Sequence, residues 1–126
     1  MSRPLFLHVG VQKTGTTSLQ RFLRRSAPAL ADAVVIRTPE EGTPMRPLGR
    51  AAIACSLAPD DDHRATLVAA FETVLDGLPD DDRPVILSHE NLAGAMPGNG
   101  GETRLFPALP AMLATLVQVA ADRGFA

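Results

Sequence analysis

The residues best suited to chemistry lie near the N-terminus, between an apolar run and a helical pattern. Residues 5–9 (LFLHV) are almost all apolar, which favours a strand buried on both faces of a sheet. They lead into GVQKTGTTS at positions 10–18, where a lysine stands between two glycines. A strand, a glycine-bounded loop and a helix start together present backbone N–H groups, the helix dipole and a lysine to one small space. The segment therefore predicts a site for a phosphate-like anion.

The position of the lysine separates this loop from the Walker A loop of nucleotide hydrolases. A Walker A loop places its lysine directly after the second glycine. Here Thr16 follows Gly15, and the lysine is Lys13. The sequence Lys-Thr-Gly-Thr-Thr after an apolar strand resembles the 5′-phosphosulfate loop of sulfotransferases that use 3′-phosphoadenylyl sulfate (PAPS), and its bacterial members in particular. The resemblance covers the N-terminal half of that domain.

This resemblance implies PAPS as donor, 3′,5′-ADP (PAP) as product and no metal. Lys13 is suited to bind the phosphosulfate and to neutralise the leaving phosphate oxygen, because such transfer depends on positioning and charge stabilisation. The acceptor is expected to be a hydroxyl or amine of a carbohydrate or small metabolite. The residues expected to bind the donor are Gln12, Lys13, Thr14, Gly15, Thr16, Thr17, Ser18 and Ser88.

A second group of polar residues, Ser-His-Glu-Asn at positions 88–91, follows the apolar run 85–87. The carboxyl ends of parallel strands open on one edge of a sheet, so these residues should face the same crevice as the loop. His89 or Glu90 could then take a proton from the acceptor. We favour Glu90 as the base, and the resemblance agrees, since related chains often carry Ser-x-Glu there. The alternative is that Glu90 caps the next turn.

The remaining pattern supplies the elements that position these groups. Helical spacing follows the loop, a second strand is expected at 33–37, and a third at 85–88. Residues 38–59 hold four prolines and two glycines, so we expect irregular chain with a short helix at 51–57. An acidic cap at 59–62 begins another helix, and a last one ends at Gly124.

This alternation predicts one α/β domain over residues 1–126, with P-loop-type three-layer α/β/α architecture, a parallel sheet and strand order 2-3-1. Another strand should begin at residues 124–126. The chain is therefore expected to be the N-terminal part of a longer domain.

The amino-acid composition argues against some classes of binding partner. The net charge of −2 and the absence of Trp and Tyr argue against a nucleic-acid surface. No apolar run approaches membrane-spanning length, and residues 1–4 lack the features of a signal peptide. The single cysteine, Cys55, fits a reducing compartment, so a cytoplasmic location is expected. The oligomeric state is left open.

Two other functions remain possible from these residues. In a P-loop kinase or nucleotide hydrolase, Glu90 would hold Mg²⁺ after its strand. In a non-catalytic remnant, the loop would bind phosphate only. The arginines at 21, 24 and 25 are expected to form a solvated helix face, and the two Asp-Asp-Asp runs to serve as caps and turns.

Overall fold

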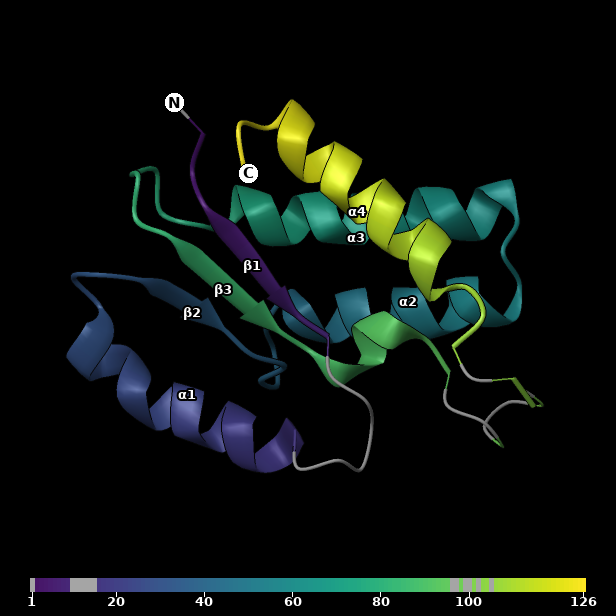
Figure 1. Ribbon diagram of the computed structural model, residues 1–126, viewed down its shortest axis with the longest axis horizontal. Helices are drawn as coiled ribbons and strands as arrows, with labels where there is room; N and C mark the ends of the chain where they lie inside the picture. Colours follow the sequence, from purple (N-terminus) through teal and green to yellow (C-terminus); the bar gives the residue numbers. More distant parts are fainter. Residues whose placement is uncertain (1, 10–15, 96–97, 99–100, 102, 105) are drawn as a thin grey trace.

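The chain folds into alternating strands and helices, and the computed structural model describes residues 2–9, 16–95, 98, 101, 103–104 and 106–126 (Figure 1). In chain order the elements are β1 (Leu5–His8), α1 (Thr16–Leu30), β2 (Val35–Arg37), α2 (Met45–Leu57), α3 (Asp61–Asp76), β3 (Val85–Ser88), the 3₁₀ helix η1 (Glu90–Ala93) and α4 (Leu109–Asp122).

The three strands form one parallel sheet in the order β1-β3-β2. This confirms the predicted α/β class, the parallel pairing and the strand order. The register places His8 beside Ser88 and Arg37 beside Leu87. The carboxyl ends of all three strands therefore meet at one edge of the sheet, where Figure 1 shows η1 following β3.

Helices cover both faces of the sheet, with α1 on one face and α2, α3 and α4 on the other (Figure 1). Alternate strand residues point to opposite faces. Val85 and Leu87 are fully buried in the core cluster on the face of the three helices. On the face of α1, Phe6 of β1 is 60% exposed, because α1 packs against β2 at the far side of the sheet.

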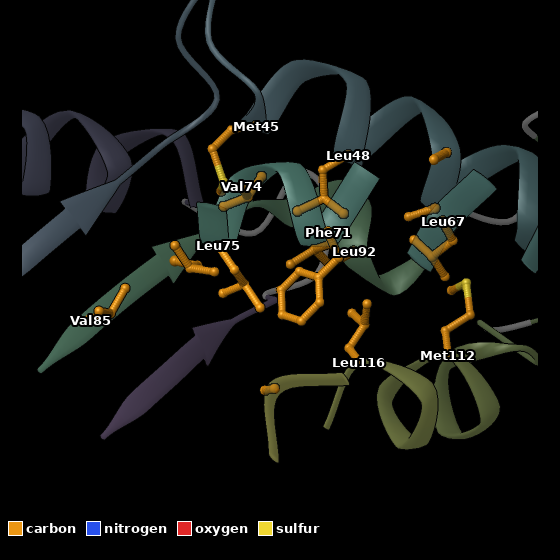
Figure 2. Close-up of a cluster of buried hydrophobic side chains, with 14 of the residues drawn as sticks. Met45, Leu48, Leu67, Phe71, Val74, Leu75, Val85, Leu92, Met112 and Leu116 are labelled. Carbon is orange, nitrogen blue, oxygen red and sulfur yellow. The ribbon is translucent and has the colours of Figure 1, made fainter. Parts of the chain in front are cut away.

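Most core side chains are aliphatic, and the ring of Phe71 lies among them. Phe71 of α3 has no exposed surface, and Figure 2 shows the residues of α2, α4 and η1 gathered around it. Leu48, Leu92 and Leu116 supply one large side chain from each of these three elements. The core thus fixes α2 and η1 against one another, next to the edge where the strands end.

Helix α2 corrects the expectation of irregular chain before residue 51. It begins at Met45, with Pro44 at the N-cap and Pro47 in the first turn. Proline is tolerated in the first turn of a helix because the N–H group that it lacks would have no partner there. The two prolines that suggested a loop therefore mark the start of a helix.

Two expected helix ends are confirmed. Asp60 is the N-cap of α3, where its carboxylate accepts a 2.8 Å hydrogen bond from the backbone N–H of His63. The pKa of Asp60 is lowered, first by this hydrogen bond. At the other end of the fold, α4 ends at Asp122, and Gly124 follows with φ +85°.

The two ends of the described chain pair with one another. The backbone N–H of Arg3 donates to Gly124 O, and that of Leu5 donates to Ala126 O, each over 2.9 Å. Arg3 and Phe125 form a parallel bridge. Because Pro4 O accepts from β3, these bonds lie on the opposite edge of β1. A strand was expected to begin at residues 124–126, and the structure shows a single parallel bridge there.

Among the described residues, no helix is both long enough and apolar enough to cross a bilayer.

Candidate functional site

The predicted anion loop connects the end of β1 at His8 to the start of α1 at Thr16, as the sequence required. Gln12, Lys13, Thr14 and Gly15 lie outside the described residues, so their expected roles stay predictions. Of the rest of the loop, Thr16 and Thr17 open α1, and Ser18 is an exposed residue of its first turn. The positive end of the helix dipole therefore lies at the carboxyl edge of the sheet.

Ser88 ends β3 with no exposed surface. Its hydroxyl lies 2.8 Å from His8 Nδ1 on the neighbouring strand, and the two residues are also register partners. This polar pair joins the two strands at the point where both end. Ser88 thus contacts protein, and its predicted contact with the donor stays a prediction.

His89 is buried, with 3% of its surface exposed, and its ring packs against the backbone of α2. It is the N-cap of η1, because its Nδ1 accepts a hydrogen bond from the backbone N–H of Asn91 over 3.2 Å. A Cβ placed on Gly49 of α2 would lie 2.5 Å from the ring Cε1. Only a glycine at position 49 leaves room for this ring.

The surroundings of His89 favour its neutral form. Its pKa is lowered, first by burial and then by the positive charge of Arg46, while Glu90 and a backbone hydrogen bond with Met45 act in the opposite direction. A neutral imidazole that accepts at Nδ1 carries its proton on Nε2. His89 is thereby fixed as the cap of the turn that carries Glu90.

Glu90 is the most accessible of the three residues at the end of β3. Its side chain is 28% exposed, and its carboxylate oxygen accepts a 2.6 Å hydrogen bond from the amide of Gln20 on α1. The same oxygen lies 3.7 Å from His89 Nδ1, too far for a hydrogen bond. His89, and not Glu90, supplies the cap of η1, so the Glu90 carboxylate is held in place by a different helix.

A pocket of ≈ 450 Å³ opens beside Glu90. Its walls come from α1, the residues after β2, α2 and the start of η1. The lining residues include Gln20, Arg24, Arg46, Arg50, His89, Glu90 and Asn91. Arg46 and Arg50 are one turn apart on α2, so they lie on the same face of that helix. The structure thus brings Glu90 together with three cations from two helices.

No role was predicted from the sequence for Gln20, Arg46 or Arg50. Gln20 lies one turn beyond the start of α1, a position from which it can reach the edge of the sheet. The pair Arg46 and Arg50 has helical spacing, but this signal is visible only if residues 45–57 are known to be helical. Arg24 is exposed, as expected for a solvated face, and it also lines the pocket.

In the described part of the chain, both acidic runs contain residues with structural roles. Asp60 caps α3, and Asp81 forms ion pairs with Arg3 and Arg83. Within the described ranges, no group of three His, Cys, Asp or Glu side chains is arranged to hold a metal ion.

Comparisons with protein-family models, with curated proteins and with solved structures found no match to this chain.

Proposed function

We propose that this protein is a sulfotransferase, or the N-terminal portion of one, that moves a sulfuryl group from PAPS to a hydroxyl or amine. The observation that carries the proposal is the 2.6 Å hydrogen bond between Gln20 and Glu90. It links a carboxylate at the end of β3 to the helix that directly follows the Lys-Thr-Gly-Thr-Thr loop. A group suited to accept a proton thus lies next to the element suited to bind the donor.

Each residue has a defined part in this reaction. Glu90 accepts the proton of the acceptor as the acceptor oxygen or nitrogen bonds to sulfur. Lys13 neutralises the phosphate oxygen that is released when its bond to sulfur breaks, and 3′,5′-ADP leaves. Gln20 and His89 position Glu90: the first donates to its carboxylate, and the second caps the turn on which it lies.

The arrangement favours Glu90 over His89 as the base. Nδ1 of His89 is occupied by the N–H of Asn91, and its ring is enclosed by α2. Both residues line the same pocket, but the side chain of Glu90 is 28% exposed and that of His89 only 4%. The proposal places the reaction in the cytoplasm, in keeping with the buried thiol of Cys55, the one cysteine of the sequence.

Ligand binding tests the proposed donor. We expect 3′,5′-ADP to bind without magnesium and more tightly than ATP in isothermal titration calorimetry. Lys13→Ala should weaken this binding by tenfold or more, since a charge-assisted contact is worth about 1.5–3 kcal/mol. Tight binding of Mg-ATP with no response to 3′,5′-ADP would instead support the kinase or hydrolase.

Turnover tests the base. Glu90→Gln keeps a side chain of the same size and should lower sulfuryl transfer by about 10²–10⁴-fold, because it removes general base catalysis. Its affinity for 3′,5′-ADP should not change. Glu40→Gln, at an exposed position before α2, is the matched control and should transfer normally. Normal transfer by Glu90→Gln would remove Glu90 from the mechanism.

A further inference from the structure

The pocket beside Glu90 is strongly cationic. Arg24, Arg46 and Arg50 contribute three positive charges to its walls, and Glu90 contributes one negative charge, which leaves a formal charge of +2. Arg24 comes from α1 and the other two from α2, so two separate elements direct guanidinium groups to one space.

These arginines have no acidic partner in the described part of the chain. Arg3, Arg64, Arg83 and Arg123, in contrast, each have a carboxylate within 3.2 Å. Arg24, Arg46 and Arg50 form no such pair with a described residue. Guanidinium groups bind carboxylates and sulfates through two parallel N–H bonds, so a pocket with three of them suits an anionic ligand.

The position of the pocket indicates which substrate brings the anion. The predicted donor loop follows β1, whereas the pocket lies past the ends of β3 and β2, with Pro39 after β2 on its wall. Along α1, Gln20 is about 6 Å and Arg24 about 12 Å beyond Thr16, at 1.5 Å per residue. Gln20, which bonds to Glu90, thus lies between the start of α1 and Arg24, and in the proposed reaction the acceptor's reacting group lies at Glu90.

We infer that the acceptor is itself an anion, a sugar or small metabolite with a carboxylate or sulfate group close to the hydroxyl or amine that is modified. Arg24, Arg46 and Arg50 bind the anionic group and so present its neighbour to Glu90. This inference rests on the proposed sulfotransferase function, and it adds the charge class of the acceptor and the residues that select it.

The test compares two acceptors that differ in one carboxylate, 4-nitrophenyl β-D-glucuronide and 4-nitrophenyl β-D-glucoside. Binding of each to the full chain is measured by calorimetry, with and without 3′,5′-ADP, and sulfuryl transfer from PAPS is measured separately. We expect the glucuronide to bind at least tenfold more tightly, because one charge-assisted pair is worth about that factor. Equal binding of the two sugars would overturn the inference.

Single substitutions test whether the pocket arginines cause the difference in binding between the two sugars. Arg46→Gln and Arg50→Gln replace exposed side chains and should each weaken glucuronide binding about tenfold, while glucoside binding is unchanged. Arg25→Gln, one residue from Arg24 on α1 and not on the pocket wall, is the matched control and should bind normally. Unchanged glucuronide binding in both pocket variants would overturn the inference.

Binding of 3′,5′-ADP to the same variants distinguishes a failure of the anionic-acceptor inference from a failure of the sulfotransferase proposal. Arg46→Gln and Arg50→Gln should keep their affinity for 3′,5′-ADP within about twofold. Loss of 3′,5′-ADP binding with glucuronide binding intact would assign the arginines to the donor and overturn the inference, while the sulfotransferase proposal stands. Arginine-dependent glucuronide binding by a chain that binds no 3′,5′-ADP would uphold the anion pocket and reject the transferase.

Discussion

At the scale of single residues, His89 shows how burial decides what a titratable group does. From the sequence, His89 and Glu90 were both candidate bases after a strand, with Glu90 favoured, since both side chains can accept a proton. In the structure both residues line one pocket, but His89 packs against α2 and caps a turn, whereas the Glu90 carboxylate is 28% exposed. The strand end could be predicted from the apolar run at 85–87. The orientation of each side chain could not, because it depends on α2, which was only partly predicted.

The burial of His89 makes a pH dependence of stability measurable. Its pKa is lowered in the folded protein, so the unfolded chain binds a proton more readily than the folded chain does. The contribution of the neutral ring is complete above the unfolded pKa of about 6.5 and is lost as the pH falls below it. We expect the free energy of unfolding to decrease between pH 7.5 and 5.5, by at most about 1.4 kcal/mol per pH unit for this group.

Urea unfolding at pH 7.5, 6.5 and 5.5 measures the decrease. It should disappear in His89→Gln and persist in His63→Gln, which changes a histidine at the solvated start of α3. The same slope in His89→Gln as in the wild-type protein would show that another group is responsible.

At the scale of elements, the prediction was correct where the sequence carried one clear signal, such as an apolar run. It was wrong where residues typical of loops occurred within a helix. The strands, the cap at Asp60 and the pairing order follow from apolar runs and alternation. Helix α2 was predicted only over residues 51–57, because Pro44, Pro47 and Gly49 are typical of loops. Tertiary contacts explain this composition: the prolines occupy the N-cap and the first turn, and Gly49 makes room for His89. The arginine pocket went unnoticed for the same reason.

The close contact between α2 and His89 predicts an unusual response to Gly49→Ala. Alanine in a helix is normally more stable than glycine by about 1 kcal/mol. At position 49 the added methyl would overlap with a buried ring, and overpacking costs about 1–3 kcal/mol. We expect a net loss of stability in urea unfolding. Gly77→Ala, at the end of α3, is the control, since its Cβ would lie 3.6 Å from the nearest atoms.

Removal of the His89 ring tests whether overlap with this ring causes the loss of stability in Gly49→Ala. In a His89→Ala background, Gly49→Ala should no longer destabilise the protein, because its methyl then has space. If Gly49→Ala costs the same in both backgrounds, the strain must arise elsewhere in α2.

At the scale of the whole molecule, Arg3 joins three segments at the edge of the sheet opposite the candidate site. Its side chain is 13% exposed and donates hydrogen bonds to the backbone oxygens of Arg83 over 2.7 Å and Pro79 over 2.9 Å. It also pairs with Asp81 at 3.2 Å and lies 5.6 Å from the centre of the Phe125 ring. The start of the chain, the segment before β3 and the C-terminal residues thus depend on one guanidinium group.

This dependence predicts that Arg3→Ala destabilises the fold by about 2–3 kcal/mol, since it leaves several acceptors and a carboxylate without their donor. Arg3→Lys keeps the charge but not the planar arrangement of donors, so it should restore less than half of the loss. Urea unfolding measures both, with Arg25→Ala on the exposed side of α1 as control. Full stability in Arg3→Lys would mean that charge alone holds the three segments together. Hydrogen exchange at Leu5 and Ala126, whose N–H groups pair these segments, should accelerate in Arg3→Ala, because the backbone bonds between them lose the side chain that holds them in register.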